Sequence, residues 1–457
     1  MKTIQPPLFR AAVSRRGFLK RVSAATAGGI ALGQLPVARF AHAVDTDEIR
    51  LALIGCGGRG SGAVVNAFNA PGGPVKLVAM ADVVERKLAT SHANLTKWAS
   101  EKVDVPPERR FIGFDAYKKA IDCLRPCDVA LLTTHAAFRP LHLEYAVGKG
   151  VNVFFEKSFA TDPSGIKRLL KAAEVAEKKN LKVAAGTMCR HSKNRQELIQ
   201  RIRDGAMGEI LLLRACRMQD FGKLGRKPEG ENTIYWQLRS VYHLYWVSAG
   251  LWSEADIHQV DEMCWIKGAL PVSAHGVGGR SAENTDCGQN LDSYAAEWTF
   301  ADGTKAYYVL RSLPNCHNEF ATYIHGAKCA AQFSGNTHAA TTRLYKDQRL
   351  SQDNIVWEPP REKVSLWQAE WDVFLDAIRT GRRHNEIRQA AMSQVADFMA
   401  RAAIHMGRVV TFDQIMASNF AWVPGGVDSL NENSSPPVVA DANGRFPVPV
   451  PGQWVEV

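Results

Sequence analysis

Glu156-Lys157 directly follows a short apolar stretch, Asn152–Phe155, and these two side chains have an evident chemical use. In an open α/β sheet, residues at the carboxyl ends of strands face the ligand crevice. A lysine placed there can hold a substrate hydroxyl by a hydrogen bond and assist the removal of its proton. The alternative from the local sequence alone is a surface Glu-Lys pair at the start of a helix.

A glycine-rich loop stands between an apolar strand pattern and a helical pattern, and it reads Gly-x-Gly-x-x-Gly. In this context the three motif glycines allow a sharp turn, a close approach of pyrophosphate and tight packing of helix against strand. The helix N-terminus then offers free N–H groups to the phosphates. We therefore expect a bound dinucleotide, contacted by Gly55, Gly57, Gly58, Arg59 and Gly60.

Asp82 ends the next apolar stretch and indicates which dinucleotide binds. An acid at this position accepts hydrogen bonds from the ribose hydroxyls and repels a 2′-phosphate, so NAD is favoured over NADP. Arg86 lies four residues later and could neutralise a 2′-phosphate, so NADP stays an alternative. Asp82 has a second use as a helix cap, which is compatible with cofactor binding.

Four motifs occur in the order and spacing of one protein family: Gly55–Gly60, Ala81-Asp82-Val83, Phe155-Glu156-Lys157 and Ala185-Gly186-Thr187. Together they resemble the Gfo/Idh/MocA oxidoreductases, over residues 49 to about 410. The resemblance implies a Rossmann domain followed by an α/β domain with a large, mostly antiparallel open sheet. It also implies a homo-oligomer and hydride transfer between a nicotinamide and a carbinol of a sugar or cyclitol.

The same resemblance assigns Glu156 and Lys157 to the cofactor site and gives Lys157 a role in proton transfer. The family's Glu-Lys-Pro motif appears here as Glu156-Lys157-Ser158. Because proline mainly stiffens a turn, its loss affects the rigidity of the loop more than the chemistry.

A second motif of the family is an acid four residues before a histidine, with an aspartate three residues after it. Here these are Glu254, His258 and Asp261, and the spacing places them on one helical face. By resemblance, His258 is the partner of Lys157 in binding and deprotonating the hydroxyl, and Glu254 orients or charge-stabilises it. Asp256 is an added carboxylate that we expect to make the site more acidic. The alternative is an ordinary polar helix face.

Weaker matches to the family add further candidate cofactor contacts. For each of these residues, a purely structural role is an equally good interpretation. Thr133 and Thr134 resemble a turn that lines the nicotinamide ribose, although His135 replaces the usual proline. Trp236 and Arg239 resemble a Trp/Arg pair that contacts cofactor in related enzymes.

Candidate substrate contacts complete the expected site. Arg190 and His191 follow a predicted strand and can reach the active site from the domain junction, and Asp261 joins them in this role. No Cys/His cluster has the spacing of a zinc site, so we expect no metal.

The elements that position these residues change character along the chain. Up to about residue 185, short apolar runs alternate with helical patterns, which is typical of a parallel βαβ sheet. The predicted strands are Ile49–Ile54, Lys76–Ala81, Val129–Thr133, Asn152–Phe155 and Lys182–Ala185. The predicted helices are Gly60–Ala70, Leu141–Gly148 and Pro163–Lys179, the last with Asp162 as its cap.

After a further helix pattern that ends near Asp204, strand patterns dominate and predict a mostly antiparallel sheet. They are Glu209–Met218, Val272–Val277, Ser293–Phe300, Thr304–Arg311 and Ala321–His325, with a hairpin turn at residues 301–303. Two helical patterns follow, Val364–Arg379 and Gln389–Met406. The last 34 residues hold six prolines and indicate an extended arm or a loose tail.

The N-terminal residues have the features of a twin-arginine export signal. Arg15-Arg16 precedes a short, weakly apolar run, and Ala41-His42-Ala43 fits a cleavage site. The run is too short for a membrane anchor. We therefore expect a periplasmic enzyme, exported by the twin-arginine translocase after folding around a tightly bound cofactor.

The predicted signal also changes how the charge is interpreted. It contains seven basic and no acidic side chains, and removing these from a net charge of +10 leaves about +3. The net positive charge of the whole chain is therefore weak support for a nucleic-acid partner. The nine scattered cysteines do not indicate a disulfide framework. We divide the chain into a signal (1–43), a Rossmann domain (44–188), a substrate and oligomerisation domain (189–423) and a proline-rich arm (424–457).

Three functions fit these features. The first is an oxidoreductase on a sugar, glycoside or cyclitol, whose exported cofactor is recycled in place by a second substrate. The second is a glycoside hydrolase in which NAD oxidises C3 transiently and elimination breaks the glycosidic bond, with Glu254, Asp256 or Asp261 as an extra proton-transfer group. The third is a binding protein that retains a nucleotide without catalysis, against which Lys157 and His258 argue.

Overall fold

The structure is a computed structural model that describes residues 48–282, 284, 286–335, 338 and 341–457, which belong to one compact unit. The predicted signal and its cleavage site near Ala43 lie outside these residues. Within the described part of the chain, no helix has the length and apolar character needed to cross a membrane.

A six-stranded parallel sheet forms the first half, in the order β3-β2-β1-β4-β5-β6. Its strands are β1 (Ile49–Ile54), β2 (Val75–Asp82), β3 (Arg110–Ile112), β4 (Val129–Leu132), β5 (Asn152–Phe155) and β6 (Val183–Ala185). β4 and β5 are buried along their whole lengths, as expected for a parallel sheet covered on both faces. The order reverses between β1 and β4, where such sheets bind ligands.

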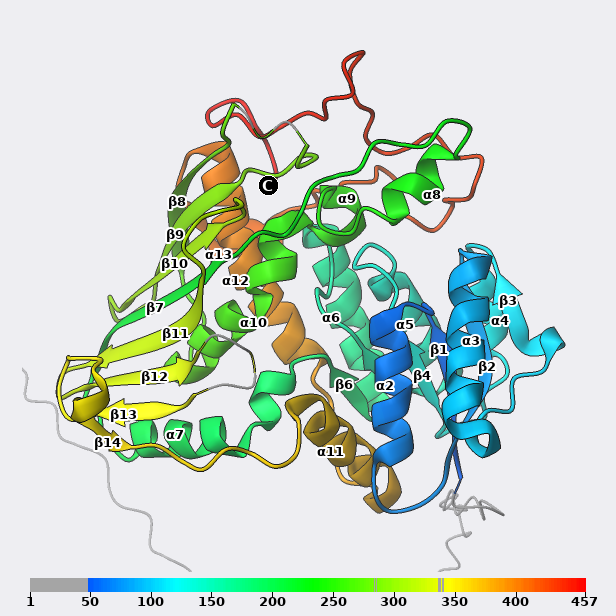
Figure 1. Ribbon diagram of the computed structural model, residues 1–457, viewed down its shortest axis with the longest axis horizontal. Helices are drawn as coiled ribbons and strands as arrows, with labels where there is room; N and C mark the ends of the chain where they lie inside the picture. The colour runs from blue at the N-terminus through cyan, green and yellow to red at the C-terminus, as the bar shows by residue number, and fades with distance from the viewer. Residues whose placement is uncertain (1–47, 283, 285, 336–337, 339–340) are drawn as a thin grey trace, which may run out of the picture. The chain divides into compact units, whose positions relative to one another are not determined.

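Helices cover this sheet on both faces (Figure 1). They include α2 (Gly58–Asn69), α3 (Glu85–Ala99), α4 (Ala116–Ile121), α5 (Arg139–Lys149) and α6 (Pro163–Lys178). The predicted cap of α6 is confirmed, because the Asp162 side chain accepts a hydrogen bond from the Gly165 N–H at 2.9 Å. The sequence analysis missed β3, α3 and α4, of which β3 has only three residues.

A nine-stranded sheet forms the second half, in the order β14-β13-β12-β11-β7-β10-β9-β8-β15. It contains β7 (Ile210–Met218), β8 (Ser273–Gly279), β9 (Ser293–Thr299), β10 (Lys305–Arg311), β11 (Glu319–Gly326), β12 (Ala330–Ser334), β13 (Arg343–Tyr345), β14 (Ile355–Trp357) and β15 (Val410–Thr411). Among the strands of this sheet that the structure describes, only the β7–β10 pair is parallel, so the predicted mostly antiparallel character is confirmed. The predicted hairpin joins β9 to β10, with Gly303 at a positive φ of 86°.

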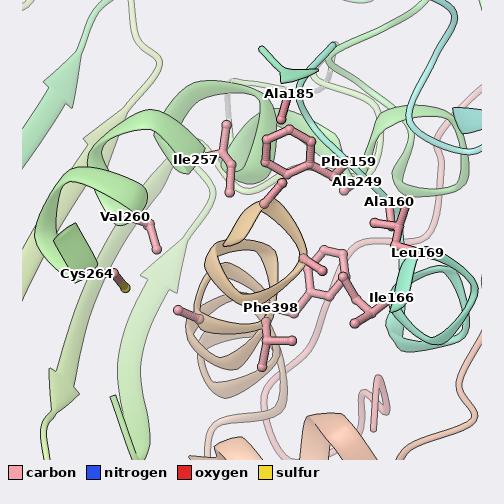
Figure 2. Close-up of a cluster of buried hydrophobic side chains, with 14 of the residues drawn as sticks. Phe159, Ala160, Ile166, Leu169, Ala185, Ala249, Ile257, Val260, Cys264 and Phe398 are labelled. Atoms are coloured by element: carbon pink, nitrogen blue, oxygen red, sulfur yellow. The ribbon is translucent and has the colours of Figure 1, made fainter. Parts of the chain in front are cut away.

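Two long helices, α10 (Gly250–Lys267) and α12 (Ile387–Met406), pack on one face of this sheet (Figure 1). Their apolar side chains share a core with the first sheet. Figure 2 shows Ile257 and Val260 of α10 beside Phe398 of α12, with Phe159 from the loop after β5. This shared core fixes α10 relative to the carboxyl end of β5.

The remaining helices are α7 (Lys193–Arg203), α8 (Thr233–Leu238), α9 (Tyr245–Ser248), α11 (Leu366–Thr380) and α13 (Phe412–Ala417). Although α11 is late in the sequence, it packs on the first sheet. Its Trp371 stacks on Phe154 of β5 with ring centroids 4.5 Å apart. A segment from the second half thus completes the helical layer of the first.

The C-terminal segment 424–457 contains neither helix nor strand, but it is packed against the rest of the chain. Glu456 is 1% exposed and forms ion pairs with Arg401 at 3.0 Å and with His405 at 2.5 Å. Phe446 is buried and stacks with Trp236. These contacts agree with an extended arm and exclude the alternative of a loose tail.

Candidate active site

A cavity of about 490 Å³ lies at the carboxyl ends of β1, β2, β4, β5 and β6, and the segment from α8 to α10 forms its other wall. Twelve of the residues predicted for the site line it: Gly55, Gly57, Gly58, Arg59, Asp82, Thr133, Thr134, Glu156, Lys157, Arg239, Glu254 and His258. The residues predicted to bind cofactor and those predicted to carry chemistry therefore share one cavity.

The glycine-rich loop has the geometry of a phosphate cradle. Gly55 has a φ of 96°, and a Cβ there would lie 2.7 Å from the backbone of Thr133. A Cβ on Gly57 or Gly58 would meet no atom within 4 Å, so the space above the N-terminus of α2 is open. Gly60 does not line the cavity; a Cβ there would lie 2.6 Å from the Thr133 hydroxyl, so this glycine serves helix packing. These features fit a dinucleotide pyrophosphate.

The Asp82 carboxylate lies in the cavity lining and accepts hydrogen bonds from two backbone N–H groups. One carboxylate oxygen accepts the Cys56 N–H at 2.6 Å and the other accepts the Val84 N–H at 2.8 Å. The carboxylate therefore supports both the loop and the start of α3, and it still lines the cavity. Arg86 is exposed outside the lining, whereas Lys87 is part of it and was missed by the sequence analysis.

Lys157 and Glu254 form an ion pair across the cavity. Lys157 Nζ donates to Glu254 Oε2 at 2.7 Å and to the Glu254 backbone oxygen at 2.9 Å. The two side chains are 20% and 7% exposed, so the pair is largely removed from water. The carboxylate fixes the ammonium group at the end of β5 while one of its N–H bonds remains for another acceptor.

His258 lies one helical turn after Glu254 and lines the same cavity. Its ring meets that of His338 edge-on, with centroids 4.5 Å apart. Burial, followed by the effect of His338, lowers the pKa of His258 well below its usual value of 6.5. The imidazole is therefore neutral at ordinary pH and has an unprotonated nitrogen that can accept a proton.

Glu156 is held by Arg59 of the glycine-rich loop, whose Nε lies 2.5 Å from Glu156 Oε1. The same guanidinium reaches Glu370 of α11 at 3.2 Å. Burial and the nearby Glu156 raise the pKa of Glu370 well above its usual range. This network joins the phosphate loop, the end of β5 and α11, and Glu370 has no local sequence signal that could have revealed it.

Thr133 and Thr134 are placed as predicted, at the end of β4. The Thr133 hydroxyl donates to the Gly55 oxygen at 2.6 Å, which ties this turn to the glycine-rich loop. Thr134 Oγ1 lies 3.1 Å from Nδ1 of His142, and His142 stacks on Tyr117 with centroids 4.1 Å apart. Burial lowers the pKa of His142 to about 3, so this ring is also neutral.

The structure separates Arg190 and Asp261 from the cavity. Arg190 donates two hydrogen bonds to the Asp261 carboxylate, at 2.8 and 2.9 Å. Asp261 also accepts hydrogen bonds from Gln389 and Ser393 of α12. His191 pairs with Glu386 at 3.3 Å, outside the lining. In place of the predicted substrate contacts, we assign Arg190 and Asp261 to the packing of α10 on its neighbours, and His191 to an ion pair at the start of α12.

Of the three residues predicted to share one helical face, Glu254 and His258 line the cavity, whereas Asp261 contacts Arg190 and α12. α10 is buried on nearly all sides, so each face has a different partner. Asp256 is fully buried and lies outside the cavity lining, and burial, followed by the nearby Asp397, raises its pKa well above the usual range. It does not make the cavity more acidic. Of the three acids considered for extra proton transfer, only Glu254 lines the cavity.

Trp236 is also displaced from its predicted role, because it packs on Phe446 of the C-terminal arm and does not line the cavity. Arg239 does line it and is paired with Glu231. Among the described residues, no cluster of three or more His, Cys, Asp or Glu side chains could hold a metal ion. All nine cysteines are free.

The chain matches no protein-family model and no curated protein. Several solved structures are similar. Myo-inositol 2-dehydrogenase from Lactobacillus plantarum is 19% identical, with a TM-score of 0.59, over 80% of this chain and 99% of that one. Aldose-aldose oxidoreductase from Caulobacter crescentus is 18% identical, with a TM-score of 0.61 and the same coverage.

Scyllo-inositol dehydrogenase from Lactobacillus casei, solved with NAD(H) and scyllo-inositol, is 19% identical, with a TM-score of 0.58, over 80% of this chain and 99% of that one. The structural neighbours thus include inositol dehydrogenases, an aldose-aldose oxidoreductase and a UDP-N-acetylglucosamine 3-dehydrogenase. This confirms the predicted fold: a Rossmann-like parallel sheet followed by a large, mostly antiparallel sheet with helices.

Proposed function

We propose that this chain is an exported NAD-dependent oxidoreductase that oxidises a CH–OH group of a sugar, glycoside or cyclitol. The observation that carries the proposal is the sharing of one cavity by the Lys157–Glu254 ion pair, the neutral His258 and the open glycine-rich loop. Neighbours whose names refer to inositol and aldose support a polyhydroxylated substrate.

Each group has a role that its geometry supports. Gly55, Gly57 and Gly58 hold the pyrophosphate of the cofactor, and Asp82 binds its ribose hydroxyls. When bound, NAD supplies the acceptor for the hydride that leaves the carbinol carbon.

Lys157 Nζ donates to the oxygen of the substrate hydroxyl and stabilises negative charge that develops there, while Glu254 keeps the ammonium in place. A ring nitrogen of His258 accepts the hydroxyl proton, because this imidazole is neutral in the folded protein. The shared core around α10 keeps the acceptor and the donor at fixed positions.

We propose further that the cofactor is NAD, that it is tightly bound and that it leaves the cytoplasm with the folded enzyme through the twin-arginine translocase. Arg15-Arg16 and the run that follows support export, and Asp82 supports NAD over NADP. A cofactor outside the cytoplasm must be reoxidised in place, so a second sugar or carbonyl compound is the expected acceptor. We also propose that the chain forms a homo-oligomer, and this proposal is based on the family resemblance alone.

The direct test starts from protein purified without added cofactor. Mass spectrometry of the released nucleotide is expected to identify NAD, and addition of sugars or cyclitols is expected to reduce it. A protein that retains no dinucleotide, and that reduces none with any sugar or cyclitol, would overturn the proposal. Cell fractionation with Arg15→Lys/Arg16→Lys as the matched variant tests export, since this variant is expected to stay in the cytoplasm.

Aryl glycosides distinguish oxidation from redox-assisted hydrolysis in the same preparation. Phenol released without added NAD would identify the glycoside hydrolase. An oxidised sugar that accumulates without phenol would identify the oxidoreductase.

A further inference from the structure

Arg139 is a buried cation in the wall of the cavity that neither the sequence motifs nor the proposed chemistry uses. It is the first residue of α5, it lines the cavity, and it is 5% exposed. It also lies near the catalytic end, since Glu254 and Glu156 are the carboxylates whose charges act on it.

The guanidinium of Arg139 is incompletely paired. Its Nη1 donates to the Ser158 backbone oxygen, and its Nε is buried without a hydrogen-bond partner. Among the described residues, no carboxylate forms an ion pair with it, whereas Arg59, Lys157 and Arg239 in the same wall each have one. A buried guanidinium without a counter-charge is costly, and a bound anion would remove that cost.

The other charges near Arg139 do not supply this counter-ion. Glu254 is neutralised by Lys157, and Glu156 by Arg59. Burial and the positive charge of Arg139 keep His142 neutral. The catalytic end of the cavity therefore carries one uncompensated positive charge, which neutral sugars and cyclitols would not balance.

We propose that the substrate carries an anionic group, a carboxylate or a phosphate, that pairs with Arg139 while its carbinol contacts Lys157 and His258. The inference rests on the proposed oxidoreductase function and specifies its substrate class as an acidic sugar. The guanidinium suits such a group because a charged N–H donor forms shorter and stronger hydrogen bonds to a carboxylate or phosphate than to a neutral hydroxyl.

The experiment compares kcat/KM for glucose, glucuronate and glucose 6-phosphate in the wild type, Arg139→Gln and Arg139→Lys. The wild type is expected to prefer one of the two acidic sugars. Arg139→Gln is expected to lower kcat/KM for that sugar about 100-fold and for glucose less than about 3-fold. Arg139→Lys is expected to restore part of the loss because it keeps the charge. Whichever acid is preferred identifies the anionic group.

Two controls separate an anion-binding role from other roles. Arg239→Gln removes a positive charge from the same wall, but Glu231 already neutralises it, so the ratio of acidic to neutral kcat/KM is expected to change less than about 3-fold. The affinity of each variant for NADH is measured in parallel. A cofactor role for Arg139 would weaken NADH binding and lower the rates for all three sugars together.

Equal losses for acidic and neutral sugars in Arg139→Gln, or a wild type without preference, would overturn the inference while leaving the oxidoreductase intact. If Arg139→Gln does not fold, a second measurement on the wild type decides the same point: inhibition of sugar oxidation by gluconate is compared with inhibition by sorbitol. Stronger inhibition by the acid is expected, and equal inhibition would overturn the inference. Failure of all three sugars and of inositols to reduce the nicotinamide would instead count against the proposed function itself.

Discussion

Lys157 Nζ lies 2.7 Å from Glu254 Oε2, although the two residues are 97 positions apart in the sequence. Lys157 follows a strand of the parallel sheet, and Glu254 lies in the first half of α10 in the second half of the chain. The contact therefore joins both halves of the fold at the cavity. It makes the orientation of the proposed catalytic ammonium depend on the packing of α10.

Lys157→Met is expected to lower kcat for sugar oxidation by about 100-fold or more, because it removes the group that binds the hydroxyl and stabilises charge on its oxygen. NADH affinity is expected to fall much less than kcat, since the glycine-rich loop and Asp82 are unaltered. Steady-state rates and NADH fluorescence titration measure the two effects. Unchanged sugar turnover would contradict the assignment of Lys157.

Glu254→Gln tests whether the ion pair positions the lysine. The variant keeps the size of the side chain and one oxygen, but it removes the charge that fixes the ammonium. We expect kcat to fall about 10-fold, a smaller loss than in Lys157→Met, since the lysine itself remains. A loss equal to that of Lys157→Met, accompanied by reduced thermal stability, would indicate a structural role instead.

The pH dependence of kcat/KM tests His258. Its pKa in the folded protein lies well below 6.5, so the neutral, proton-accepting form persists as the pH falls through 6.5. The acid limb of the profile is therefore expected well below that pH. His338→Gln is expected to shift the limb to higher pH, because His338 contributes to the lowered pKa of His258. A wild-type limb near 6.5 would contradict this account.

Asp82→Ser tests cofactor choice. Removing the carboxylate relieves repulsion of a 2′-phosphate, and Lys87 in the same wall can then attract it. The ratio of NADH to NADPH affinity is expected to fall about 100-fold, measured by titration of the apoprotein. A wild type that prefers NADPH, or a ratio that stays constant in the variant, would contradict the role given to Asp82.

The buried Glu456 anchors the C-terminal arm, and Glu456→Gln is expected to destabilise the fold by about 3–5 kcal/mol because Arg401 would remain buried without its partner. Urea unfolding at neutral pH measures the change. The exposed Glu432 provides the control, since Glu432→Gln is expected to cost less than about 0.5 kcal/mol. Equal stability of the two variants would show that the arm is not anchored by this carboxylate.

The pKa of Glu456 predicts when this stabilisation is lost. Arg401 and His405 outweigh the effect of burial and lower its pKa from 4.5 to about 2. A carboxyl whose pKa is lower in the folded than in the unfolded state stabilises the protein above its unfolded value. The contribution is therefore complete above pH 4.5 and declines as the pH falls toward 2. The difference in unfolding free energy between wild type and Glu456→Gln is expected to shrink over that interval.

The sequence predicted the parts of the fold whose signals are local. Continuous apolar runs predicted five strands of the parallel sheet, and the capping residue Asp162 predicted the start of α6. The strands β13 and β14 were missed because each has only three residues and depends on neighbours along the sheet. Their positions are set by tertiary contacts that no local pattern contains.

The same distinction applies to the site. Gly55–Gly60, Lys157 and His258 were found because each belongs to a motif with fixed spacing. Arg139, His338 and Glu370 were missed because they come from separate segments that meet only in the folded chain. Asp261 was assigned to substrate because helical spacing predicts which side of the helix a residue lies on, but it does not predict what that residue contacts. In the structure, Asp261 contacts Arg190 and α12.

Transfer of deuterium tests the central claim most directly. Wild-type protein, purified without added cofactor, is incubated with sugars and cyclitols deuterated at their carbinol carbons, and the released nucleotide is examined by mass spectrometry. The account predicts NADH that carries one deuterium on its nicotinamide, and much less of it in Lys157→Met. Absence of a nicotinamide dinucleotide, or a dinucleotide that never acquires deuterium from any of these compounds, would contradict the account.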